Sequence, residues 1–137
     1  MNGSLESGPG SLEGGSPARL VVLVDDTRDF KDGRDALTAR TSQEAVALLR
    51  SLQACPLDDL WLDYDLSHGD TAQPVVDHLV ALAACGEPLQ VGRILVHSSN
   101  IRHGHRIRAE LAAAGYPARR SYAANLFVRH RWPGTLD

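Results

Sequence analysis

The sequence predicts a three-layer α/β domain built around a parallel sheet. Strand-like segments alternate with amphipathic, helix-like segments along most of the chain, which favours strand–helix–strand units. The run at 20–24 is continuously apolar rather than alternating, as in a strand that is buried on both faces. The chain has 137 residues, 43% hydrophobic and 23% charged, which suits one globular domain.

The first elements are predicted from short patterns near the start of the domain. The apolar run at 20–24 predicts a central strand, and residues 36–39 predict a short second strand. Thr41 and Glu44 have the spacing of a capping box, which predicts that an amphipathic helix begins there. We expect this helix to end before Pro56.

The remaining elements continue the alternation. We predict strands at 57–62, 91–96 and 118–122, and helices at 73–84 and 102–114. Each of these helices is followed by a glycine that can end it. The domain is thus predicted to span 19–122, after a disordered, Gly- and Ser-rich leader over 1–18 and before a C-terminal extension over 123–137. The pattern leaves open whether the extension packs on the domain.

Composition and charge exclude some classes of protein. No apolar run approaches the roughly 18 residues of a membrane span, and no signal segment is visible, so we expect a cytoplasmic protein without membrane contact. Cys55 and Cys85 lack the spacing of metal ligands, and we expect buried thiols. Residues 1–70 carry 6 basic and 13 acidic side chains, whereas 71–137 carry 8 and 4. This asymmetry is either accidental or typical of a site where carboxylates hold a metal and arginines face an anion.

Polar side chains follow three of the predicted strands, at the point where each strand ends. They are Asp25 and Asp26, then Asp63 and Asp65, then His97, Ser98, Ser99 and Asn100. Ligands of parallel α/β sheets bind beyond the carboxyl ends of the strands, so we expect these clusters to form one site. The structural alternative is that each cluster is only a polar turn.

The carboxylates predict a site for a hard cation. Asp25, Asp26 and Asp63 are our candidate ligands for Mg²⁺, which prefers oxygen ligands and accepts substrate phosphate in its coordination shell. Asp65 is a further candidate site residue. In the alternative reading, Asp26 caps the following turn and Asp65 lies in a solvated loop.

The other polar residues predict proton transfer and phosphate binding. His97 can act as a general acid or base, or simply bond to a neighbouring carbonyl. The candidate phosphate ligands offer hydroxyl, amide, backbone N–H and guanidinium donors around the start of a helix, where anions bind readily. They are Arg28, Ser98, Ser99, Asn100 and Arg102. For Arg102, a solvated helix face is an equal alternative.

Three segments together resemble a known family. They are VDDTR at 24–28, LDYDL at 62–66 and HSSN at 97–100. They are similar to the "LDD-x-R", "LDHDLG" and "HSANP" segments of cyclic-phosphate processing receiver-like domains, an atypical bacterial branch of the response-regulator receiver superfamily. The resemblance covers residues 20–122. It implies a flavodoxin/receiver-like parallel sheet, in which an acidic pair and a phosphoacceptor Asp bind Mg²⁺ and a Ser or Thr contacts the phosphoryl group.

The chain departs from these patterns at identifiable positions. Only 26–34 separate the first two predicted strands, so the first helix of a receiver is expected to be shortened or lost. Tyr64 stands where the branch has His, and Ile101 where it has Pro. Arg119 and Arg120 stand near the place of the lysine that ends the last strand of an ordinary receiver.

The resemblance leads to a functional hypothesis. We expect a Mg²⁺-dependent phosphoesterase-like domain that processes the cyclic phosphate of a nucleotide or an RNA end, with Asp63 and His97 as catalytic residues. In this hypothesis Asp63 holds the metal or acts as the nucleophile. The alternative is a non-catalytic receiver-like signalling or interaction module. A haloacid-dehalogenase-type phosphatase, with Asp63 and Asp65 as its DxD motif, is disfavoured because that motif follows the first strand in such enzymes.

Overall fold

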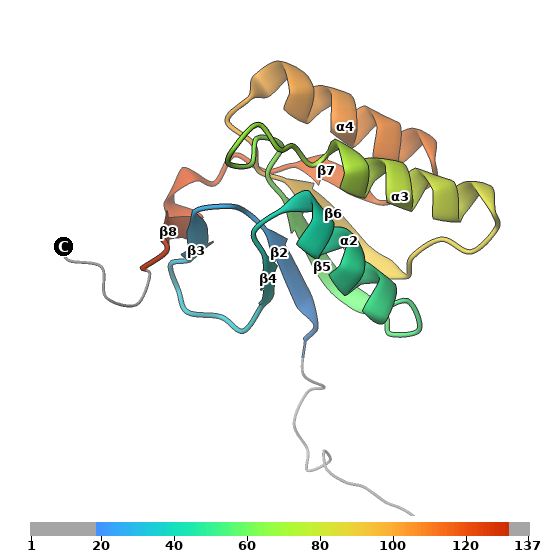
Figure 1. Cartoon of the computed structure of the whole chain (residues 1–137), viewed down its shortest axis with the longest axis horizontal. Helices are drawn as coiled ribbons and strands as arrows, with labels where there is room; N and C mark the ends of the chain where they lie inside the picture. The colour runs from blue at the N-terminus through green and yellow to red at the C-terminus, as the bar shows by residue number, and fades with distance from the viewer. Residues whose placement is uncertain (1–18, 132–137) are drawn as a thin grey trace, which may run out of the picture.

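The computed structural model describes residues 19–131, so the predicted leader over 1–18 and the end of the predicted extension lie outside the described residues. Seven strands are present in this range: β2 (Val21–Val24), β3 (Arg28–Phe30), β4 (Leu37–Ala39), β5 (Leu57–Leu62), β6 (Val91–Val96), β7 (Ala118–Arg120) and β8 (Phe127–Arg129). The helices are α2 (Ser42–Ser51), α3 (Gln73–Ala84), α4 (Ile101–Ala113) and the short 3₁₀ helix η2 (Ala124–Leu126). Figure 1 shows their arrangement.

A five-stranded parallel sheet forms the centre of the molecule, which confirms the predicted α/β class. Its strand order is β4-β2-β5-β6-β7. All four pairings within it are parallel. Since every strand runs in the same direction, the ends of β2, β5 and β6 lie side by side, and the polar residues that follow them meet at one edge of the sheet.

The three α-helices cover one face of this sheet (Figure 1). Buried side chains from the helices and from alternate strand positions form the larger core, including Val22, Leu60, Ile94, Leu79 and Ile107. The predicted start of α2 is confirmed, because the Thr41 side chain accepts a hydrogen bond from the backbone N–H of Glu44 at 3.1 Å. The Glu44 carboxylate in turn accepts from the backbone N–H of Arg40 at 2.8 Å.

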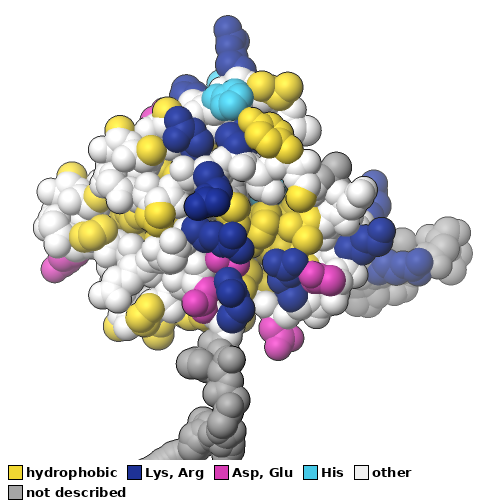
Figure 2. Space-filling model, turned by 180° about the vertical axis from the view of Figure 1, so that it is seen from behind, with side chains coloured by type: hydrophobic (Ala, Val, Ile, Leu, Met, Phe, Trp, Pro, Cys, Tyr) yellow, Lys and Arg dark blue, Asp and Glu magenta, His cyan; other side chains and the backbone are white. Residues whose placement is uncertain are grey.

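The opposite face is covered in part by a two-stranded antiparallel ribbon, which the sequence patterns did not predict. The ribbon pairs β3 with β8, so that Phe30 lies opposite Phe127. Both rings pack on Trp61 of β5, with ring centroids 5.4 Å and 5.8 Å away. The third layer of the domain at this place is therefore a ribbon, and part of the extension packs on the domain. Figure 2 shows this side, where hydrophobic side chains are surrounded by basic and some acidic ones.

One sequence prediction is confirmed and another needs correction. The segment 26–34 has lost the receiver helix, as predicted, and part of it forms β3. Cys55 and Cys85 are exposed free thiols, not buried ones, because each lies at or beyond the end of a helix and outside its apolar face. Among the described residues, no helix is long and apolar enough to cross a bilayer.

Candidate functional site

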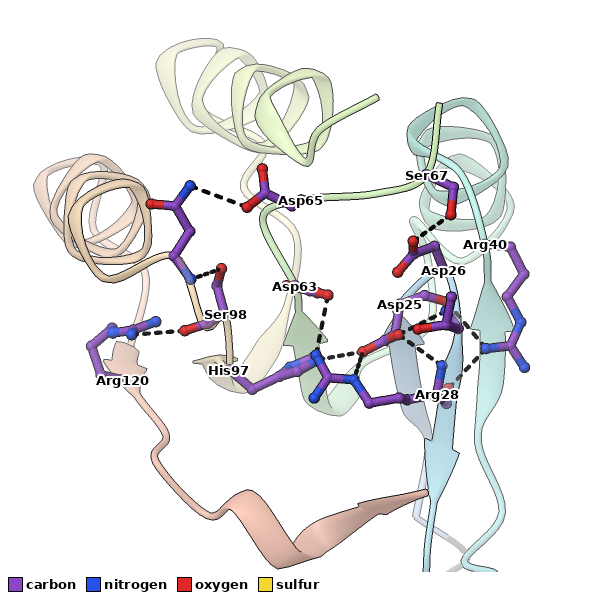
Figure 3. Close-up of polar contacts among 12 residues, drawn as sticks. Asp25, Asp26, Arg28, Arg40, Asp63, Asp65, Ser67, His97, Ser98 and Arg120 are labelled. Carbon is purple, nitrogen blue, oxygen red and sulfur yellow. Dashed lines mark hydrogen bonds and ion pairs between the residues drawn. The ribbon is translucent and has the colours of Figure 1, made fainter. Parts of the chain in front are cut away.

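The predicted strand-end residues meet in a buried cluster at the carboxyl edge of the sheet. Asp25 follows β2, Asp63 follows β5 and His97 follows β6. All three are buried, and each offers one ligand atom within 4.8 Å of those of the other two. Within the described residues this is the group whose spacing suits a metal ion. Figure 3 shows the three side chains converging on the space beside Arg28.

Asp25 is held in its ionised form. Burial by itself raises the pKa of this carboxyl, but hydrogen bonds from His97 and from the backbone of Thr27, with the charge of Arg28, lower the pKa below its usual value. One oxygen, Oδ1, accepts the backbone N–H groups of Thr27 and Arg28 at 2.9 Å and 2.8 Å. The other, Oδ2, lies 3.0 Å from His97 Nε2.

His97 is therefore a neutral side chain with a defined orientation. Burial lowers the pKa of this imidazole although the neighbouring carboxylate of Asp25 favours its charged form. Because ionised Asp25 can only accept a hydrogen bond, we assign the ring proton to Nε2. Nδ1 is buried, and no partner for it occurs among the described residues. The ring stacks on Phe127, with centroids 4.5 Å apart.

Asp63 has the opposite character from Asp25. Burial and the negative charge of Asp25 raise the pKa of Asp63 to about 7, and the guanidinium of Arg28 offsets only part of this effect. The contact from Arg28 Nη2 to Asp63 Oδ2 is 3.5 Å, and that from Arg28 Nε to Asp25 Oδ2 is 3.4 Å. Both distances are long for ion pairs, so Arg28 can turn one N–H toward another anion.

The remaining predicted carboxylates lie around this cluster rather than in it. Asp26 points toward the loop after β5, where its Oδ2 accepts a 2.5 Å hydrogen bond from Ser67 (Figure 3). Asp65 is exposed, and its Oδ2 accepts from the Asn100 side chain at 3.1 Å. Asp26 remains at the border of the site, whereas Asp65 links the β5 loop to the start of α4.

The predicted phosphate-binding residues divide into two groups. Ser98 is buried and Ser99 exposed, and both line a pocket beside His97. Asn100 is the N-cap of α4, where its side chain accepts the backbone N–H of His103 at 3.2 Å. Arg102 is exposed in the first turn of α4 and does not line this pocket. Helix α4 thus begins at Ile101 and is capped by a residue that sequence reasoning assigned only to phosphate binding.

Two arginines that sequence reasoning did not select hold the site in place. Arg40 donates to the backbone carbonyls of Asp25 and Arg28 at 3.1 Å and 2.8 Å, and to Asp29 at 2.5 Å. Arg120, at the end of β7, donates to the carbonyls of Val96 and Ser98 at 3.2 Å and 3.0 Å. No local motif marks Arg40, and Arg120 was noted only for its place near that of the receiver lysine, because each acts through backbone atoms that are distant in sequence.

Arg120 also explains a glycine inside α4. A Cβ built on Gly104 would lie 2.7 Å from Arg120 Cζ. We therefore expect Gly104→Ala to lower the free energy of unfolding by about 1–3 kcal/mol, because the guanidinium must leave two carbonyls. In an Arg120→Ala background the same change should be neutral or stabilising by up to about 1 kcal/mol, since alanine favours helix over glycine. Urea unfolding of the wild type, the two single variants and the double variant measures the coupling between Gly104 and Arg120. An equal effect of Gly104→Ala in both backgrounds would contradict it.

Comparison with known proteins agrees with the motifs at the strand ends. The model of the cyclic-phosphate processing receiver domain matches residues 20–113, which include all three. Two similar solved structures are receiver domains. That of the Francisella response regulator 1452 is 16% identical with a TM-score of 0.46, covering 75% of this chain and 84% of that one. That of Thermotoga maritima CheB is 15% identical with a TM-score of 0.45, covering 80% and 83%. No significant match is found among curated proteins. The extent of the family match shows that this chain belongs to the cyclic-phosphate processing receiver domain family.

Proposed function

We propose that this protein is a Mg²⁺-dependent phosphoesterase that opens the cyclic phosphate of a nucleotide or of an RNA end. The observation that carries the proposal is the packing of Asp25, Asp63 and His97 within 4.8 Å of one another. Arg28 lies beside them with two long, replaceable ion pairs. The name of the family model, cyclic-phosphate processing, supports the choice of substrate.

The donor set fits a hard divalent cation. Burial and the negative charge of Asp25 together raise the pKa of Asp63 to about 7, and a bound cation would offset both effects by favouring the charged carboxylate. Asp25 and Asp63 would hold Mg²⁺, since carboxylate oxygens are the ligands that this ion prefers, and Asp26 would join them by turning away from Ser67. When bound, the ion would stabilise negative charge that develops on the phosphate oxygens.

The chain's own residues would position the phosphate and move the proton. Arg28 can turn from its long carboxylate contacts to a phosphate oxygen, and the Ser98 and Ser99 segment offers further donors. His97 would act as the general acid or base of the reaction, and Asp25 would stabilise its imidazolium form through Nε2. Water adds to phosphorus, one P–O bond of the ring breaks, and the leaving oxygen is protonated to give a phosphomonoester.

A hydrolysis panel tests this proposal. Purified protein with Mg²⁺ is incubated with 2′,3′- and 3′,5′-cyclic nucleotides, RNA ending in a cyclic phosphate, and acetyl phosphate. We expect turnover of a cyclic phosphate, with a loss of at least about a hundredfold in Asp63→Asn. Asp77→Asn, on the exposed surface of α3, is the matched control and should retain activity.

Other outcomes of the panel would overturn the proposal in defined ways. Stable labelling by acetyl phosphate without ester turnover would assign the protein to signalling receivers. No turnover by a folded protein that binds Mg²⁺ would favour a non-catalytic interaction module. Turnover with Mn²⁺ or Zn²⁺ but not Mg²⁺ would favour His97 as a metal ligand, because imidazole suits these ions better.

A further inference from the structure

A pocket of about 300 Å³ opens directly beside the carboxylate cluster. It lies between the start of α4 and the segment from β7 to β8, and it adjoins Arg28 and His97. Its volume is at the lower end of the range for small-molecule sites, which suits one ring system with a small attachment. A ligand in this pocket would therefore be continuous with a phosphate at the cluster.

One part of the pocket wall is hydrophobic and unusually exposed. Ile101 and Tyr122 are 65% and 69% exposed, although both are large apolar or aromatic side chains. Phe127 lines the same pocket and stacks on His97. Large exposed hydrophobic side chains around a concave, polar-bordered surface are typical of ligand sites.

Two aromatic rings of the pocket have packing partners within the chain. The Arg120 guanidinium lies 5.1 Å from the centroid of the Tyr122 ring and is itself fixed by backbone carbonyls of β6 and the loop after it. Phe127 is stacked between neighbours, with Phe30 at 5.2 Å and His97 at 4.5 Å. Such contacts lower the cost of ordering the aromatic side chains when a planar ring binds.

The rest of the wall is polar and carries positive charge. Ser98, Ser99 and Ser121 supply hydroxyl groups, and Arg28 and Arg120 supply the charge. Among the described residues, no acidic side chain lines the pocket. This combination disfavours a purely aliphatic ligand, which would leave the polar groups unpaired, and it suits a heterocycle whose edge carries hydrogen-bonding atoms.

We propose that this pocket binds the base of a nucleoside by stacking on Tyr122, while the attached cyclic phosphate lies at Arg28 and the carboxylates. The inference rests on the proposed function and adds the part of the substrate that the phosphate chemistry leaves open. Stacking on an aromatic side chain tolerates every base. We therefore expect the pocket to distinguish cyclic phosphates with a base from those without one, and to distinguish less between different bases.

The test compares two substrates with the same phosphate ring. Adenosine 2′,3′-cyclic phosphate carries a base, whereas glycerol 1,2-cyclic phosphate does not. We expect the ratio of their kcat/KM values to fall about tenfold in Tyr122→Ala and to be retained in Tyr122→Phe, which keeps the ring. Leu37→Ala removes another exposed apolar side chain, on β4 and outside the pocket, and should leave the ratio unchanged. An unchanged ratio in Tyr122→Ala would overturn the inference.

A binding measurement separates this inference from the proposed reaction. Saturation-transfer NMR with adenosine 3′-monophosphate requires no turnover, and the base protons should receive magnetisation from the wild-type protein and far less from Tyr122→Ala. Base contact without any hydrolysis would support the pocket and overturn only the proposed reaction. Hydrolysis without base contact would overturn only the pocket. Comparing the kcat/KM of a short RNA ending in a cyclic phosphate with that of the cyclic mononucleotide shows whether the protein prefers an RNA end or a free nucleotide.

Discussion

Asp63→Asn is expected to stabilise the metal-free protein at pH 8, by on the order of 4 kcal/mol. The folded-state pKa of Asp63 is raised from 3.8 to about 7, by burial and by the charge of Asp25. Between about pH 4 and pH 7 the folded protein keeps a proton on Asp63 that the unfolded chain has lost, so its stability falls over this range. At pH 8 the buried carboxyl is charged and the full cost is present. A change of one pKa unit corresponds to about 1.4 kcal/mol of stability. Asparagine is neutral, so burial and the charge of Asp25 do not destabilise it in this way.

Urea unfolding in a chelator at several pH values measures this effect. The advantage of the variant should be absent below about pH 4 and grow up to about pH 7. Added Mg²⁺ should stabilise the wild-type protein and reduce the difference, because an ion that binds only the folded state shifts the unfolding equilibrium. Asp77→Asn, on the surface of α3, should behave like the wild-type protein. A variant less stable than the wild type at pH 8 would contradict the assignment of the raised pKa to Asp63.

Phe30→Ala is expected to cost about 3–5 kcal/mol, because it removes a buried aromatic ring. Phe30 is 6% exposed and packs on both Trp61 and Phe127, so its loss leaves a cavity under the β3–β8 ribbon. The same ribbon contains Arg28, which lies in the site, and Phe127, which stacks on His97. We therefore expect the change to weaken ligand binding as well as stability.

Urea unfolding gives the stability change, and two variants make it interpretable. Phe30→Leu keeps most of the apolar volume and should cost clearly less. Val128→Ala, 45% exposed on the same ribbon, should stay within about 0.5 kcal/mol of the wild type. If Phe30→Ala cost no more than Val128→Ala, the ribbon would not be a packed layer of the domain.

Sequence patterns predicted the elements whose signals are local. A continuous apolar run located β2, and shorter apolar runs located β5 and β6. The spacing of Thr41 and Glu44 located the start of α2. The ribbon was missed because β3 is only three residues long, with the sequence RDF, and its partner lies about a hundred residues away. Neither strand has an apolar pattern that distinguishes it from a loop.

The meeting of the strand-end clusters was predictable, whereas the direction of each side chain was not. Parallel strands bring Asp25, Asp63 and His97 to one edge whatever the details of packing. That Asp26 turns to Ser67, and that Asn100 caps α4, depends on competition among hydrogen-bond partners in the folded chain. Arg40 and Arg120 act on backbone carbonyls, which leave no signature in the sequence.

The pairing of β3 with β8 has a consequence for the biogenesis of the site. The sheet and its helices use residues up to Arg120, but the ribbon that holds Arg28 and covers His97 needs Phe127, Val128 and Arg129. Closing so long a loop is entropically demanding and is favoured only after the intervening structure has shortened it. A nascent chain emerging from the ribosome can thus assemble its carboxylates early, yet it acquires a finished binding edge only after its last ribbon strand has been translated.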